Sequence, residues 1–247
     1  MDEPTCGQFR VGHSLPPMSA QIAFLGFIVS GLIIGALHFI APTALLDPYR
    51  TTISQYSLTS LGWLFSIGVI ALVVGSAAAI VTLLSTRQIR VGSVGFWMLL
   101  IWTLGMAGVA VFEKTNWAYG PSTSGTIHRM LSIAAFIALP IGVLWIVAQA
   151  VSARRSHRLR RGRTALWASA VLGAASAGYL IYVVVLIVNG TIVGQPWWQT
   201  IPLGLTERVL VVTEVAALAA LVMWARQCAQ TSTATDAPII DAQAAVD

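Results

Sequence analysis

Ionisable side chains are rare in this 247-residue sequence, and the few that interrupt its apolar runs are the residues able to carry chemistry. Glu214 lies about two turns inside an apolar stretch, where a carboxylate is costly unless it is paired, protonated or hydrated. Glu207 precedes it by seven residues and shares nearly the same face of a helix. The candidate site residues are His38, Ser54, Glu113, His128, Arg129, Glu207, Arg208 and Glu214.

Metal chemistry is one function that these residue types allow. Histidine and carboxylate ligands with an open position suit a catalytic zinc ion, and two histidines at one depth suit haem. His38 and His128 are the residues available for either group. The sequence contains no HExxH motif, so no metal ligands are assigned and the cofactor stays unknown.

Nucleophilic chemistry is a second function, and proton transfer is a third. An acyl-transfer site could combine Ser54 or Ser57 with His128 and Glu113, although no GxSxG motif is present. Glu214 could instead carry a proton in a small transporter. Catalytic residues are therefore unknown, and whether the protein is an enzyme stays open.

A structural role is the alternative for the same residues. Charges inside a membrane usually pair with one another, so Arg129 or Arg208 could neutralise a nearby carboxylate and join the helix ends. The carboxylates within reach are those of Glu113, Glu207 and Glu214.

The composition identifies the elements that must position these groups. Hydrophobic residues make up 57% of the sequence, charged residues only 9%, and the mean hydropathy is +0.80, whereas soluble domains carry about 25% charged residues. We predict an all-α, polytopic transmembrane helix bundle of about six spans. The predicted spans are 20–41, 60–84, 94–112, 127–151, 164–188 and 207–225.

The same pattern predicts three regions along the chain. Residues 1–19 are expected to form a disordered cytoplasmic segment, residues 20–226 the six-helix transmembrane domain, and residues 227–247 a disordered cytoplasmic tail. Met18 stands directly before the first span and is an alternative start of translation to Met1. Gly and Ala at four-residue spacing predict close helix packing at Gly31 with Gly35, Gly173 with Ala177 and Ala174 with Gly178.

Basic residues predict the orientation, with both termini inside the cell. Arg87 and Arg90 lie between spans two and three, and six arginines lie between spans four and five, so both loops are expected in the cytoplasm. These six are Arg154, Arg155, Arg158, Arg160, Arg161 and Arg163. We therefore expect a multi-pass protein of the inner (plasma) membrane whose polar residues gather at the extracytoplasmic face. The net charge of +5 is local and argues for membrane lipids, not nucleic acid, as partners; protein partners are unknown.

Three short motifs resemble a bacterial and archaeal family of six-span membrane proteins catalogued as domain of unknown function 998. They are Ile53-Ser54, Gly125-Thr126-Ile127-His128 and Gly204-Leu205-Thr206-Glu207-Arg208. In that family an acidic residue often follows the Ile-Ser pair, where this sequence has Gln55. The resemblance implies the six-span fold and draws attention to Ser54, His128 and Arg208, but it implies no activity.

Three hypotheses follow. The first is a protein that binds a lipid or small partner of the cell envelope at the outer polar residues. The second is a membrane-embedded hydrolase or transferase, with or without a metal ion, that acts on lipid-linked substrates of the outer leaflet. The third is a small proton-coupled transporter that uses Glu214.

Overall fold

The chain folds as a bundle of long helices in a computed structural model that describes residues 18–152, 162–196 and 201–235. Within these ranges the structure is helical and contains no strand. Six helices are long and apolar enough to cross a membrane. They are α1 (Met18–Ala36), α2 (Gly62–Ser85), α3 (Val94–Val111), α4 (Thr123–Ser152), α5 (Arg163–Ile192) and α7 (Leu203–Thr235).

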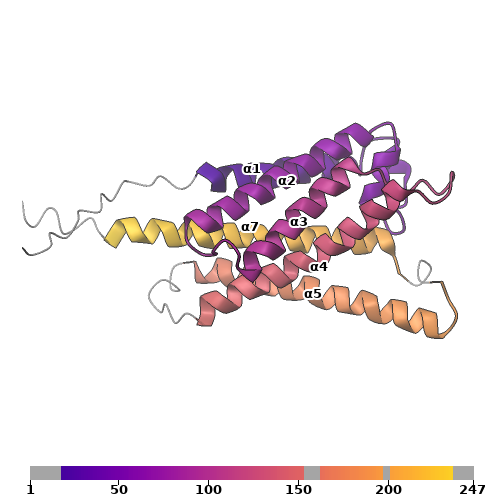
Figure 1. Cartoon of the computed structure of the whole chain (residues 1–247). Coiled ribbons are helices and arrows are strands. Elements are labelled where there is room, and N and C mark those ends of the chain that lie inside the picture. Colours follow the sequence, from indigo (N-terminus) through magenta and orange to yellow (C-terminus); the bar gives the residue numbers. More distant parts are fainter. Residues whose placement is uncertain (1–17, 153–161, 197–200, 236–247) are drawn as a thin grey trace, which may run out of the picture.

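Neighbouring helices in the sequence pair in space. α1 packs on α2, α3 on α4, and α5 on α7, while α7 also reaches α1, α2 and α4. The last helix thus closes the bundle against the first pair, and Figure 1 shows its gold ribbon running between the others. The start of α1 and the end of α7 lie at one end of the bundle.

Irregular chain and two short 3-10 helices gather at the other end. Residues 37–61 contain η1 (Thr43–Leu45) and η2 (Ile53–Leu58), and residues 112–122 join α3 to α4. We call this the loop end of the bundle. In η2 the side chain of Gln55 accepts a hydrogen bond from the backbone N–H of Thr52, which fixes the first turn of that helix.

Apolar side chains and close backbone contacts hold the helices together. Trp102 of α3 is fully buried, and its indole N–H donates to the Ser76 hydroxyl of α2 over 3.1 Å. Gly26 and Gly75 bring α1 and α2 into direct backbone contact, because a Cβ added at Gly26 would lie 2.7 Å from the Cα of Gly75. This contact explains how two such apolar helices pack so closely.

The predicted small-residue contacts are only partly correct. Gly173 does lie against another helix, since a Cβ there would meet Val143 at 3.0 Å. Gly31, Gly35 and Gly178 have nothing within 4 Å of an added Cβ, so the expected close packing at Gly31 with Gly35 is wrong. Spacing alone did not show which face of α1 meets α2.

The six predicted spans are confirmed, with shifted ends. α1 ends at Ala36, so His38 lies in the following turn and not inside the helix. α7 begins at Leu203 and continues to Thr235, so the described part of the predicted tail, 227–235, is helical. The rest of that tail and residues 1–17 lie outside the described residues, as do five of the six clustered arginines.

Candidate functional site

Arg208 is the most extensively bonded side chain at the loop end. Its Nε donates to Nε2 of His38 over 2.9 Å, and its NH2 donates to the Tyr56 hydroxyl over 2.9 Å. NH1 donates to the backbone carbonyls of Thr51 and Gly204, each over 2.8 Å. The planar guanidinium thereby joins α7 to the chain after α1 and to η2, which we call the Arg208 cluster.

The hydrogen bonds around His38 define its tautomer. Its Nδ1 lies 2.8 Å from the carbonyl oxygen of Ile34, which can only accept, so Nδ1 carries a proton. Nε2 accepts from Arg208, so it carries none. His38 is a neutral imidazole in this arrangement, and its ring also packs edge-on against Tyr56 with 5.4 Å between centroids.

A second polar cluster forms around Lys114, just after α3. Lys114 Nζ donates to Thr52 Oγ1 and, over 3.0 Å, to Ser54 Oγ. The backbone N–H of Ser54 points at Glu207 Oε2 over 3.4 Å. We call these four residues the Lys114 cluster, and they connect η2, the α3–α4 loop and the first turn of α7.

Burial and the nearby carboxylate shift the pKa of Lys114 in opposite directions. Burial lowers the pKa of its ammonium group, because the charged form loses water, while the Glu207 carboxylate raises it. The loss of water is the larger effect, so the pKa is lowered from its ordinary value of 10.5. A lysine of this kind sheds its proton more readily than an exposed one.

His128 lies beside the Lys114 cluster in the second turn of α4. Its Nδ1 is 2.8 Å from the Phe112 carbonyl oxygen, so Nδ1 donates and Nε2 is a bare acceptor. The side chain is only 3% exposed, and among the described residues Nε2 has no hydrogen-bond partner. Lys114 and Glu207 are close enough to influence its charge, so all three belong to one electrostatic environment.

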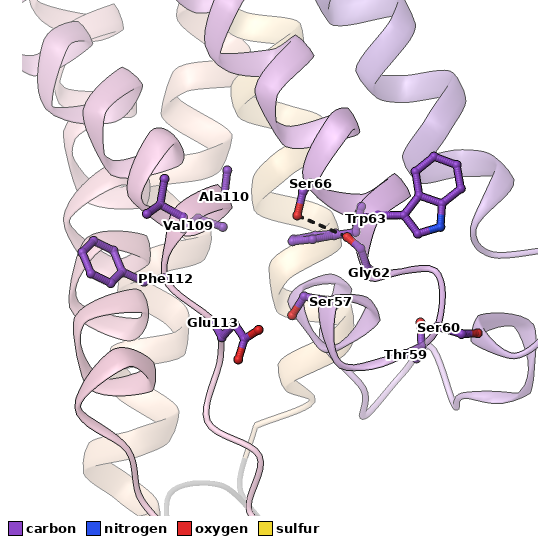
Figure 2. A pocket seen from close by; sticks show the side chains of 12 residues that line it. Ser57, Thr59, Ser60, Gly62, Trp63, Ser66, Val109, Ala110, Phe112 and Glu113 are labelled. Carbon is purple, nitrogen blue, oxygen red and sulfur yellow. Dashed lines mark hydrogen bonds between the residues drawn. The ribbon is translucent and has the colours of Figure 1, made fainter.

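Glu113 lines a groove between α2 and α3. The groove has a volume of about 310 Å³ and lies at the loop end. Figure 2 shows the Glu113 side chain directed toward Ser57 of η2. The lining residues are Ser57, Thr59, Ser60, Gly62, Trp63, Phe65, Ser66, Val109, Ala110, Val111, Phe112 and Glu113.

Glu214 lies deeper, between α7 and α5. It is 1% exposed, and Oε1 accepts a 2.8 Å hydrogen bond from the Ser176 hydroxyl of α5. Among the described residues, Oε2 has no hydrogen-bond partner. Glu214 and Glu207 share a face of α7, as predicted, but their polar partners come from different elements.

The eight predicted residues thus separate into several groups. His38 is hydrogen-bonded to Arg208. The Ser54 N–H points at Glu207, and His128 lies beside them. Glu113 lines the groove, and Glu214 is buried against Ser176. Arg129 is exposed. Among the described residues, the hydrogen bonds of Arg208 go to neutral acceptors, and Lys114 is the cation beside Glu207.

Sequence reasoning did not select Lys114, Thr52, Tyr56 or Ser176 as site residues. The sequence does distinguish Lys114, since it is the single lysine in a chain with thirteen arginines. The other three are ordinary hydroxyl residues, and only the packing of distant segments shows that they meet charged groups.

The arrangement bears on the two enzymatic hypotheses. Within the part of the chain that the structure describes, no three His, Cys, Asp or Glu side chains lie together in a way that could hold a metal ion. His38 is engaged by Arg208, which removes support from a shared site with His128. The Ser54 hydroxyl contacts Lys114, and Ser57 donates to the Ser54 carbonyl over 2.7 Å, so neither serine bonds to His128 as the predicted acyl-transfer site required.

The fold and these clusters define a polytopic α-helical membrane protein with buried polar groups at one end of its bundle. The family model described as "Protein of unknown function (DUF998)" matches residues 22–224, which cover four spans completely and most of the first and last, and the chain belongs to this family. The search of curated proteins and the search of solved structures found no match.

Proposed function

We propose that the protein binds a membrane lipid with an amine-bearing headgroup in the groove between α2 and α3. The observation that carries the proposal is that the groove presents hydrogen-bond acceptors beside a carboxylate. Its volume of about 310 Å³ lies at the lower end of the 300–1,000 Å³ typical of small-molecule sites, enough for a headgroup and the first carbons of a lipid.

The groove hydroxyls act as acceptors because their protons are already committed. Ser57 donates to the Ser54 carbonyl over 2.7 Å, Thr59 to Tyr56 over 2.8 Å, and Ser66 to Gly62 over 3.2 Å. Thr59 Oγ1 also accepts from the Leu61 N–H over 3.3 Å, so each hydroxyl oxygen keeps at least one lone pair for a donor from outside the protein. A primary ammonium group has three N–H donors and a positive charge, which match these oxygens and Glu113.

The apolar part of the groove suits the acyl portion of such a lipid. Phe65, Val109 and Phe112 line it, while Trp63 stands at its outer edge with 62% of its surface exposed. Tryptophan favours the boundary between headgroups and acyl chains, so this end of α2 fits the membrane interface. The polar and apolar halves of the groove then face the matching halves of a lipid.

The distribution of arginines supports an extracytoplasmic position for this groove. Arg87 and Arg90 lie between α2 and α3, and Arg163 begins α5. The end of α2 and the start of α5 lie at the end of the bundle opposite to the loop end (Figure 1). Loops rich in arginine stay in the cytoplasm. We therefore propose a plasma membrane protein whose groove faces lipids of the outer leaflet.

Lipid binding can be tested on the purified protein by native mass spectrometry and by titration in detergent. Phosphatidylethanolamine should bind more tightly than phosphatidylcholine, which has the same charge but no N–H donor, and than phosphatidylglycerol. Glu113→Gln should weaken phosphatidylethanolamine binding by about tenfold, the equivalent of 1.4 kcal/mol. Asp47→Asn, an exposed carboxylate outside the groove, is the matched control.

A second pair of variants tests the location. Ala110→Phe should fill the groove and abolish selective binding, whereas Ala118→Phe, on an exposed loop position outside it, should not. Equal affinity for phosphatidylethanolamine and phosphatidylcholine, or unchanged binding in Ala110→Phe, would refute the proposal.

One observation supports a hydrolase or transferase as a second candidate. Lys114 Nζ donates to the Ser54 hydroxyl over 3.0 Å, and the pKa of Lys114 is lowered, so a neutral Lys114 would lie within reach of the Ser54 proton, as in a Ser-Lys nucleophilic pair. Ser54 would add to an ester carbonyl, pass its proton to neutral Lys114, and release the alcohol after Lys114 returns the proton. A fluorophosphonate probe should label Ser54 in the wild type but not in Lys114→Met, and an unlabelled wild type would reject this candidate.

A further inference from the structure

The interface between α5 and α7 carries a line of polar contacts that the lipid groove does not use. Nearest the loop end, the Tyr179 hydroxyl lies 3.4 Å from Thr206 Oγ1. Further in, Ser176 donates to Glu214, and beyond it Ser169 donates to the Ala217 carbonyl over 2.9 Å. Residues 169, 176 and 179 share one face of α5, so the contacts follow a single line along the interface.

The surroundings of Glu214 indicate which oxygen would carry a proton. Oε1 accepts from Ser176, a bond that a carboxylate or the carbonyl oxygen of a carboxylic acid can receive. Oε2 has no partner among the described residues and is fully buried, so the proton of a neutral acid would be placed there. An ionised carboxylate without a cation would be costly at this position, and the neutral acid avoids that cost.

No charged side chain on the surrounding elements is placed to neutralise Glu214. α1 and α2 have no ionisable residue, and Glu207, seven positions earlier in α7, is about 10 Å away along the helix axis. Apart from Tyr179, which lies one turn beyond Ser176 and is neutral, the ionisable groups on the other packed elements lie nearer the ends of the bundle. They are Tyr56 in η2, His128 and Arg129 in α4, Arg163 and Tyr182 in α5, and Arg208, Arg226 and Cys228 in α7.

α5 is the helix least enclosed by the rest of the protein. In its most apolar window 11% of the residues are buried, compared with 28% to 56% in the other five spans. α5 packs on α7 and α4 at the edge of the bundle, and an edge helix can separate from its neighbours at lower cost than a central helix. The hydroxyls of Tyr179 and Thr206 lie between Glu214 and the loop end, where such a separation would first admit water.

We propose that Glu214 and Ser176 form a proton-binding site in the membrane interior, which exchanges its proton with the loop end past Tyr179 and Thr206. Binding joins a proton from hydronium to Oε2 and leaves water, and release reverses this step. A carboxyl group that loads and releases a proton at this depth is the element that a proton-coupled carrier needs. The site is separate from the lipid groove and does not depend on it.

Infrared spectroscopy of the full-length protein in lipid nanodiscs tests the site directly. At neutral pH the wild type should show the carbonyl band of a protonated carboxylic acid, and Glu214→Gln should lack it. Ser176→Ala should retain the band and move it to higher frequency, because the carbonyl oxygen loses its donated hydrogen bond. This second variant keeps the test decisive if Glu214→Gln does not fold.

The exchange route is tested by the rate at which that band shifts after transfer to D₂O. Tyr179→Phe with Thr206→Val should slow the shift at least fivefold, whereas Tyr182→Phe, an exposed tyrosine of the same helix, should leave it unchanged. Absence of a protonated band in the wild type would overturn the proton site. An unchanged exchange rate in the double variant would overturn the route, and neither result depends on lipid binding.

Discussion

Arg208 Nε donates a hydrogen bond to His38 Nε2 over 2.9 Å, and this contact joins two residues that are 170 positions apart. It links the turn after α1 to α7 at the loop end. The other three contacts of the guanidinium go to backbone carbonyls and to Tyr56, so a single side chain holds three segments in place. The candidate sites around it depend on that arrangement.

Replacing Arg208 should therefore destabilise the bundle. Arg208→Ala should lower the free energy of unfolding by about 2–4 kcal/mol, because four part-buried acceptors lose the charged guanidinium as their donor. Arg208→Lys should recover part of this loss, since a lysine cannot supply the planar fork. Thermal unfolding in detergent measures both, with the exposed Arg129→Ala as the control that should change little.

A double-mutant cycle isolates the contact between these two residues. His38→Leu with Arg208→Ala should be less harmful than the sum of the single changes, by about 0.5–3 kcal/mol. Strictly additive effects would show that His38 and Arg208 are not coupled and that the cluster forms through the other contacts alone.

Gly204→Ala should loosen the start of α7. A Cβ at this position would lie 2.5 Å from the carbonyl oxygens of Pro48 and Thr51, and the Thr51 carbonyl is itself an acceptor for Arg208. We expect a loss of about 1–3 kcal/mol in stability. Gly31→Ala is the matched control, because nothing lies within 4 Å of its Cβ position, and equal unfolding temperatures for the two variants would contradict the contact.

Lys114 should make stability depend on alkaline pH. Its pKa is lowered from the ordinary value of 10.5 by burial, so between the lowered pKa and 10.5 the unfolded chain binds more protons than the folded one. Stability contributed by this group therefore rises with pH across that window, and it is lost as pH falls through the lowered pKa. The effect should be at most about 1 kcal/mol, because the side chain is only half-buried.

The measurement is the difference in unfolding temperature between the wild type and Lys114→Met as pH is raised toward 10.5. This comparison removes the contribution of tyrosines and cysteines that titrate in the same range. A difference that stays constant with pH, or that grows in the opposite direction, would show that burial does not control the charge of Lys114.

The sequence identified the membrane spans well because the signal for them is physical and local. A run of about 20 apolar residues can only be buried in lipid or in protein, and its backbone must bond within a helix. The same reasoning placed Glu214 inside a span and Glu207 on the same face of that helix. It located His38 less well, because the end of α1 depends on how residues 37–61 pack over the bundle.

The sequence by itself determined an all-α membrane fold of six spans and the few ionisable residues that interrupt them. Tertiary structure decided their partners: Arg208 meets His38, Glu207 lies beside Lys114, and Glu214 meets Ser176. Hydropathy is a property of each segment alone, whereas a hydrogen bond depends on the rotation and depth of two helices far apart in the chain. Those are fixed by side-chain packing between helices, which no single segment encodes.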